Sequence, residues 1–263
     1  MDLGIKNRVA VVAASSRGLG KATAFRLAQE GAKVMICARG KERLFETRKE
    51  ITASTGSVVR SFVADVRDEK AVGGMIQQVV DEFGTVDILV SNAGGPQAGM
   101  ADDFTVEDYR KAAELNLLST VSLCYKVIPL MKKQKWGRII TMTSVSAKQP
   151  VENLILSNTA RAGVIGFTKS LSNQLAPHRI TVNSVLPGYT RTERVEELAR
   201  SYQKQGRGSV EEFYKNIEKN IPAGRLGNPQ ETAQAVAFLA SEGAAYITGV
   251  SLQVDGGYIQ GLF

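Results

Sequence analysis

Residues 8–20, RVAVVAASSRGLG, join an apolar run to a turn that contains Gly18 and Gly20, and a helical pattern follows. Glycine has no Cβ, so the backbone of such a turn can lie close to a phosphate group, while the helix that opens there offers free N–H groups. A second apolar run, DILVSNAGG at 87–95, also ends in a turn of small residues. Together the two turns predict a dinucleotide-binding α/β fold. The glycine spacing alone would also fit a strand-to-helix turn that holds no ligand.

Strand-like runs alternate with helical stretches along the whole chain, which predicts right-handed βαβ units. Several runs are continuously apolar, as expected for strands covered by helices on both faces. We therefore predict an α/β fold with three layers, a doubly wound (Rossmann-type) parallel seven-stranded sheet. The runs are 9–14, 33–38, 58–64, 86–91, 138–143, 179–186 and 250–254. In the first helix Ala24, Leu27 and Ala28 form the buried face, and Gly31 is placed to end it.

The composition fits one domain over 1–263, because 43% of the 263 residues are hydrophobic. The net charge of +7 is spread along the chain, which favours anionic ligands and predicts no nucleic-acid partner. Cys37 and Cys124 are too few for a disulfide framework or a metal cluster, so we expect both in the core and no metal. We find no secretory signal or membrane-spanning run, so we expect no membrane association and a cytoplasmic protein.

One long charged segment, 192–220, interrupts the alternation between the sixth strand and a helix expected near Pro229. Long insertions at this place are often mobile lids. We predict a substrate lid, and the alternative is a surface helical pair with no part in catalysis.

Several stretches form an ordered set of motifs. Residues 13–20 correspond to a Thr-Gly-x-x-x-Gly-x-Gly turn, SNAG at 91–94 to Asn-Asn-Ala-Gly, and NSVLPGYTRT at 183–192 to an Asn-x-x-x-Pro-Gly segment. This set resembles the short-chain dehydrogenase/reductase family over nearly the whole chain, and within it the 3-oxoacyl-[acyl-carrier-protein] reductases and the sugar and alcohol dehydrogenases that share their pattern. The resemblance implies an oxidoreductase that acts on a small molecule. It also implies a homotetramer, with a dimer as the alternative, built through the long fourth and fifth helices and the C-terminal strand.

The resemblance also assigns site residues. Asn116 and Ser144 match the active-site Asn and Ser, Asp65 matches the acid that receives the adenine amino group, and Thr192 lies in the segment that holds the carboxamide. The full set of predicted coenzyme-binding residues is Ser15, Ser16, Arg17, Gly18, Leu19, Gly20, Arg39, Asp65, Val66, Asn92, Ala93, Gly94, Arg161, Pro187, Gly188, Thr190 and Thr192. Ala14 replaces the first glycine of the turn, and we expect its φ to stay negative because it carries a Cβ.

The coenzyme can be predicted from charge. A site for NAD places a carboxylate at the end of the second strand, where this chain has Ala38 followed by Arg39. Arg17 and Arg39 can instead hold a 2′-phosphate through charge-assisted hydrogen bonds of about 1.5–3 kcal/mol each. We therefore predict NADP(H) rather than NAD(H). The alternative is that both arginines are solvated surface charges.

The catalytic pair of the family is replaced. The family has a Tyr thirteen positions after its Ser and a Lys four positions later, but this chain has Ser157 and Arg161. Both still share one helical face. A serine hydroxyl is a weaker acid than a phenol by roughly five pKa units, or about 7 kcal/mol. Arg161 can keep the positive charge and the ribose hydrogen bonds, but a guanidinium does not relay protons.

Three hypotheses follow. The chain is a reductase whose proton comes through water held by Ser144, Asn116 and Ser157, or from Tyr189. Alternatively it binds NADPH without turnover, as a sensor or an inactive subunit. A nucleic-acid-binding role is the third and least favoured. Because the smaller Ser157 opens volume and a buried guanidinium seeks an anion, we also predict a substrate with a carboxylate or phosphate that reaches Arg161; pairing of Arg161 with an internal acid or with the ribose alone is the alternative.

Other conspicuous residues have plainer interpretations. His178 is expected to be structural, because it precedes the sixth strand and so lies away from the strand ends where ligands bind. Trp136 is expected to anchor a helix-to-strand corner. We expect Tyr125 and Tyr246 to pack rather than catalyse.

Overall fold

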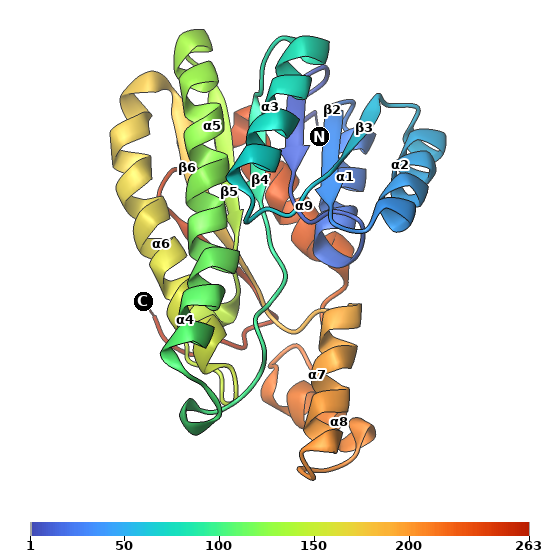
Figure 1. The fold of residues 1–263 in the computed structure, drawn as a ribbon, viewed down its shortest axis with the longest axis vertical. Coiled ribbons are helices and arrows are strands. Elements are labelled where there is room, and N and C mark those ends of the chain that lie inside the picture. Colours follow the sequence, from blue (N-terminus) through green and yellow to red (C-terminus); the bar gives the residue numbers. More distant parts are fainter. Residues whose placement is uncertain (1, 263) are drawn as a thin grey trace.

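The computed structural model describes residues 2–262. Its centre is a parallel sheet of seven strands in the order β3-β2-β1-β4-β5-β6-β7 (Figure 1). The strands are β1 Val9–Val12, β2 Lys33–Ala38, β3 Val59–Val63, β4 Ile88–Ser91, β5 Gly137–Met142, β6 Ile180–Pro187 and β7 Ser251–Val254. The order reverses between β1 and β4, and ligands of such sheets bind in the crevice beyond the carboxyl ends of the strands at this reversal. The predicted fold is confirmed, and each strand lies within two residues of its predicted ends.

Helices cover both faces of the sheet, which makes three layers (Figure 1). One face carries α1 Gly18–Gln29, α2 Lys41–Thr55 and α9 Pro229–Ala240, and the other carries α3 Glu69–Phe83, α5 Ser119–Gln134 and α6 Ile155–Leu175. Because the inner strands are covered on both sides, every residue of β1, β4, β5 and β6 is buried. Cys37 and Cys124 lie fully buried within this core, as predicted. Burial raises the pKa of the Cys37 thiol to about 11 and that of Cys124 to about 12.

The ends of the first helices follow from local chemistry. In α1, Ala24, Leu27 and Ala28 face the core as predicted, and Gly31, with φ at +81°, turns the chain into β2. Asp68 caps the amino end of α3, because its carboxylate accepts the N–H groups of residues 70 and 71 at 2.9 and 3.1 Å. Gly31 thus sets the entry into β2 at the amino edge of the sheet, and Asp68 sets the end of the loop that leaves β3 at the carboxyl edge.

The charged segment 192–220 forms two helices, α7 Glu193–Lys204 and α8 Val210–Asn220, which extend below the sheet in Figure 1. They pack on each other and on the following loop through a small apolar cluster of Val195, Ile217, Ile221 and Leu226. Helix α9 begins at Pro229, as predicted. The remaining helix, α4 Val106–Ala113, continues through a π-helical turn, Glu114–Leu118, into α5.

Trp136 anchors the corner between α5 and β5, as predicted. The guanidinium groups of Arg8 and Arg138 lie 3.8 and 4.3 Å from the centre of its ring, and its Nε1 donates to Oε1 of Glu242 at 2.9 Å. Tyr125 and Tyr246 do not pack as expected, because their exposed fractions are 66% and 101%. Tyr125 lies on the outer side of α5, where no other helix covers it.

The sequence predictions also concern membrane-spanning helices, metal-binding groups and the position of His178. Within residues 2–262 no helix has the length and apolarity needed to cross a membrane. In the same range no group of three metal-binding side chains comes together. His178 lies half-buried in the short turn between α6 and β6, at the opposite edge of the sheet from the loops described next.

Candidate active site

The turn between β1 and α1 is wound so tightly that two positions require glycine. Gly18 begins α1 with φ at +54°, a conformation that a side chain disfavours. A Cβ at Gly20 would lie 2.3 Å from the carbonyl oxygen of Ala14 and 2.9 Å from Cα of Ser15. The turn therefore leaves the amino end of α1, with its free N–H groups, open toward the crevice at the carboxyl end of β1.

Ala14 departs from the prediction, since its φ is +46° rather than negative. The left-handed conformation costs an alanine roughly 1–2 kcal/mol. Hydrogen bonds on either side stabilise this conformation. Nδ2 of Asn92 donates to the carbonyl oxygens of Ala13 and Ala14, both at 3.3 Å. The N–H of Ser15 donates to the carbonyl oxygen of Cys37 at 2.9 Å. The turn thus keeps the shape that a glycine would give it.

Ser15 is fully enclosed by the turn. Its exposed fraction is 0%, and its Oγ donates to the carbonyl of Val12 at 2.7 Å and accepts the N–H of Cys37 at 3.1 Å. Every polar group of its side chain is therefore used to tie the turn to β1 and β2. The side chain of Ser15 thus shapes the turn, and contact of Ser15 with a coenzyme stays a prediction.

The loop after β3 carries Asp65 and Val66 to the same edge of the sheet. Arg67 donates to Asp65 through its side chain at 2.6 Å and its backbone N–H at 3.0 Å. The hydrogen bonds from Arg67 hold the pKa of the Asp65 carboxyl below its usual value, so it is ionised at neutral pH. Arg39, exposed at the end of β2, adds a smaller effect of the same sign. Asp65 is thus an acceptor, as contact with an adenine amino group requires.

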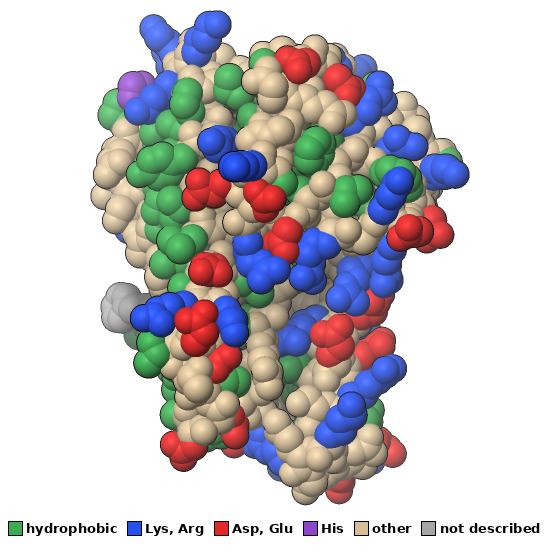
Figure 2. Space-filling model, in the orientation of Figure 1, with side chains coloured by type: hydrophobic (Ala, Val, Ile, Leu, Met, Phe, Trp, Pro, Cys, Tyr) green, Lys and Arg blue, Asp and Glu red, His purple; other side chains and the backbone are tan. Residues whose placement is uncertain are grey.

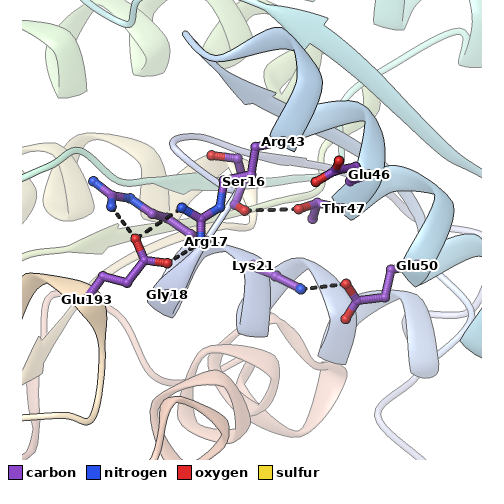
Figure 3. A pocket seen from close by; sticks show the side chains of 9 residues that line it. All are labelled: Ser16, Arg17, Gly18, Lys21, Arg43, Glu46, Thr47, Glu50 and Glu193. Carbon is purple, nitrogen blue, oxygen red and sulfur yellow. Dashed lines mark hydrogen bonds and ion pairs between the residues drawn. The ribbon is translucent and has the colours of Figure 1, made fainter.

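A residue that the sequence analysis did not single out, Arg43, lies beside Arg17. Both line a cavity of about 360 Å³ that opens next to the turn, and Glu193 of α7 lies between their guanidinium groups (Figure 3). Arg39 is not among the residues that line this cavity. The signal for Arg43 was its place in the first turn of α2, directly after the loop that carries Arg39. The predicted clamp of Arg17 with Arg39 stays a prediction.

The loop after β6 closes the site from the other side. Pro187 ends the strand, and a Cβ at Gly188 would lie 2.8 Å from Cα of Asp255, so the loop passes tightly over β7. The hydroxyl of Thr190 donates to the carbonyl of Gly188 at 3.2 Å, and that of Thr192 donates to Thr190 at 3.2 Å. Thr192 precedes the first residue of α7 and comes within 3.6 Å of a Cβ built on Gly18, so this loop meets the phosphate turn.

Three serines meet where β5 ends and α6 begins. Ser144 accepts the N–H of Ser146 at 3.1 Å, and the hydroxyls of Ser146 and Ser157 lie 3.2 Å apart. Ser157 is buried, whereas Ser144 is half-buried. The structure thus brings the predicted pair of Ser144 and Ser157 together through Ser146, which the sequence analysis had not singled out.

Arg161 lies one turn after Ser157 on the buried face of α6, with an exposed fraction of 7%. Its Nη1 donates to the carbonyl of Thr143 at 2.8 Å, and within residues 2–262 no carboxylate lies within 4.0 Å of it. Burial, and then the charge of Arg194, lower the pKa of Arg161 to about 10, so it stays charged at neutral pH. Arg194, at the start of α7, donates to the carbonyl of Pro96 at 2.7 Å.

Asn116 lies in the π-helical turn between α4 and α5, a distortion found often at functional sites. Its Nδ2 donates to the carbonyl of Gly94 at 3.0 Å, which ties it to the loop after β4. Its Oδ1 is buried and has no hydrogen-bond partner among the described residues. A buried acceptor of this kind needs a donor from water or from a ligand.

The surroundings of Tyr189 make its phenol a poor proton donor. It packs against Tyr258 with ring centres 5.5 Å apart, within the apolar cluster under α8. Burial raises the pKa of its phenol above the ordinary value, with a further effect from Tyr258. A phenol with a raised pKa is a weaker acid.

Comparison with known proteins agrees with this geometry. Residues 13–259 match the family model described as Enoyl-(Acyl carrier protein) reductase, a model of short-chain dehydrogenases/reductases. The chain belongs to the short-chain dehydrogenase/reductase family. The family prediction is confirmed, and the protein is an oxidoreductase of this type.

Relatives cover the whole chain. The 3-oxoacyl-[acyl-carrier-protein] reductase FabG of Escherichia coli is 37% identical over 255 residues, 97% of this chain and 98% of the relative. The NADPH-dependent reductase BacG of Bacillus subtilis is 31% identical over 260 residues, 98% of this chain and 100% of the relative. The solved structure of L-sorbose reductase from Gluconobacter frateurii, complexed with NADPH and L-sorbose, superposes with a TM-score of 0.94 at 31% identity and full coverage of both chains.

Proposed function

We propose that this protein is an NADP(H)-dependent carbonyl reductase that acts on a small anionic ketone, with a 3-oxoacyl thioester as the alternative substrate. The observation that carries the proposal is the pairing of an intact phosphate turn with two guanidinium groups, Arg17 and Arg43, at the ribose side of the crevice. Relatives named as NADPH-dependent or solved with NADPH support the same coenzyme.

The residues fit the coenzyme. Gly20 lets the turn close against Ala14, and the amino end of α1 supplies N–H groups for a pyrophosphate. Asp65 would accept from the adenine, and Asn92 holds the turn in shape. Arg161 would bind the nicotinamide ribose. When bound, NADPH supplies the hydride for the reduction.

The proton must come from groups other than a tyrosine at position 157. We propose that a water molecule between Asn116, Ser144 and Ser157 carries it. Oδ1 of Asn116 has no hydrogen-bond partner within residues 2–262, and the Ser157 hydroxyl lies 3.2 Å from that of Ser146. Such a relay lets Ser157 orient the water without itself acting as the acid, and the positive charge of Arg161 favours release of the proton.

We infer the substrate class from the guanidinium groups of Arg161 and Arg194. Arg161 has no carboxylate partner within residues 2–262, and Arg194 lies against Gly95, where a built Cβ would be 3.0 Å from its Nε. Two buried or half-buried cations that repel each other favour an anion between them. A carboxylate or phosphate on the ketone would fill this role.

One experiment tests the proposal. NADPH oxidation is followed with a panel of ketones, keto acids and thioesters, for the native chain beside the double variant Ser157→Tyr, Arg161→Lys. We expect turnover by the native chain, best with keto acids. Turnover by the double variant alone would favour the second candidate, an NADPH-binding sensor or inactive subunit, to which the loss of the tyrosine points.

Arg161→Ala tests the substrate class. We expect this variant to raise the KM for keto acids by a factor at least ten times larger than the factor for neutral ketones, since a charge-assisted pair contributes about 1.5–3 kcal/mol. Equal losses for both classes would refute an anionic substrate.

The assembly, the lid and the location are also proposals. Hydrophobic side chains gather over α5 and α6 in Figure 2, and Tyr125 of α5 is exposed, which supports a homotetramer formed through these helices. We propose that 192–220 is the substrate lid and that the protein works in the cytoplasm. Sedimentation at micromolar concentration would give the mass of four chains.

A further inference from the structure

The carboxylate of Glu193 lies between two guanidinium groups (Figure 3). Arg43 donates to it through both Nη atoms, one of them at 3.0 Å, and Arg17 donates to the same Oε2. Arg17 also lies 3.5 Å from Oε1 of Glu197. The Glu193 carboxylate thus pairs with both arginines and holds their guanidinium groups beside the amino end of α7.

The three residues come from separate parts of the fold. Arg17 precedes the first residue of α1, Arg43 lies in the first turn of α2, and Glu193 is the first residue of α7. Lys21 and Thr47, which line the same cavity, are already bonded to Glu50 and to the carbonyl of Ser16 at 2.6 and 2.9 Å. Arg17 and Arg43 are therefore the cations of the cavity whose partner is supplied by α7.

Two converging guanidinium groups match the oxygens of a phosphate as well as those of a carboxylate. A phosphate dianion carries more charge and more acceptor oxygens than Glu193, so it can displace the carboxylate. We propose that Glu193 is a specificity-determining residue: it occupies the cations that would hold the 2′-phosphate of NADP(H), and its displacement couples binding of a phosphorylated coenzyme to release of α7. This inference rests on the proposed coenzyme.

Displacement of Glu193 should affect the binding of NADP(H) and NAD(H) differently. A phosphorylated coenzyme must break the contacts of Glu193, so it binds more weakly than the open site would allow. An unphosphorylated coenzyme brings no anion to Arg17 and Arg43 and leaves these contacts in place. Because the side chains of both arginines are about half exposed, each contact is an exposed ion pair of modest strength that salt weakens.

Glu193→Gln tests the inference, with Glu196→Gln as the matched control. Glu196 lies in the same first turn of α7 and has no ion pair among the described residues, so its variant removes the same charge without touching Arg17 or Arg43. The dissociation constants of NADPH and NADH are measured by calorimetry at low and high salt. We expect Glu193→Gln to bind NADPH about tenfold more tightly at low salt, equal to about 1.4 kcal/mol, with a smaller gain at high salt. NADH binding should change less than twofold, and the control should match the native chain.

Arg43→Gln supplies a second measurement. This variant should bind NADPH at least fivefold more weakly and leave the affinity for NADH unchanged. Adding Glu193→Gln to Arg43→Gln should raise the affinity for NADPH by less than Glu193→Gln raises it in the native chain. Unchanged NADPH affinity in Glu193→Gln would overturn the inference while leaving the proposed coenzyme intact. Weaker NADH binding in that variant would also overturn it, because Glu193 would then be a ribose acceptor. Failure of the native chain and all variants to bind NADPH would instead refute the proposed function.

Discussion

Gly20 offers a sharp test of how the phosphate turn is built. It lies in α1 with negative φ, so replacement by alanine would by helix propensity alone stabilise the protein by roughly 0.5–1 kcal/mol. The structure predicts the opposite sign. The new Cβ would lie 2.3 Å from the Ala14 carbonyl oxygen and 2.9 Å from Cα of Ser15, and these are backbone atoms that cannot rotate away.

The size of the effect follows from these two opposed terms. Overpacking of this kind costs roughly 1–3 kcal/mol, so Gly20→Ala should lower the free energy of unfolding by about 1–2 kcal/mol. Gly73 in α3 is the matched control, because the nearest atom to its built Cβ is the flexible end of Lys126 at 3.9 Å. Gly73→Ala should raise stability by roughly 0.5–1 kcal/mol.

Urea denaturation followed by circular dichroism measures both variants. The two variants should differ in stability by about 1.5–3 kcal/mol, so at roughly 2–4 °C per kcal/mol for a domain of this size their melting temperatures in a thermal scan should differ by about 3–12 °C. Gly20→Ala should also lose most of its NADPH affinity, since the turn must shift to admit the methyl group. Equal stabilisation by the two substitutions would refute the account of the turn given above.

Further predictions concern single side chains. The hydrogen bond from Arg225 lowers the pKa of Glu231 to about 2, so the stability it contributes is present above about pH 4.5 and is lost as the pH falls toward 2. Glu231→Gln should therefore lower the urea midpoint at pH 7 and flatten its decline between those values; an unchanged profile would contradict this. Asp68→Ala should cost about 1 kcal/mol in urea denaturation, because it removes the cap of α3. Tyr189→Phe should turn over NADPH within twofold of the native chain, and a large loss would restore Tyr189 as the proton donor.

Several features of this fold depend only on residues that are neighbours in the sequence. The apolar runs and glycine turns sufficed to predict the strands and the parallel topology, since periodicity and turn chemistry act over a few residues. The spacing of Ser144, Ser157 and Arg161 was enough to put the last two on one face of α6. Local pattern also marked 192–220 as a long charged insertion after the sixth strand, where the structure has α7 and α8.

Three features depended on contacts between distant segments. Ala14 adopts a positive φ because Asn92 and Cys37 hold its turn from other strands, which no local rule foresees. The exposure of Tyr125 depends on which side of α5 the neighbouring helices leave uncovered. The meeting of Arg17, Arg43 and Glu193 needs three helices brought to one edge of the sheet.

The sequence by itself therefore determined the fold, the phosphate turn and the loss of the catalytic tyrosine, since each is written in residues near one another along the chain. Only the tertiary structure decided which charges face which. Ion pairs form between side chains separated by more than a hundred residues, and their partners follow from packing geometry that composition and spacing do not encode.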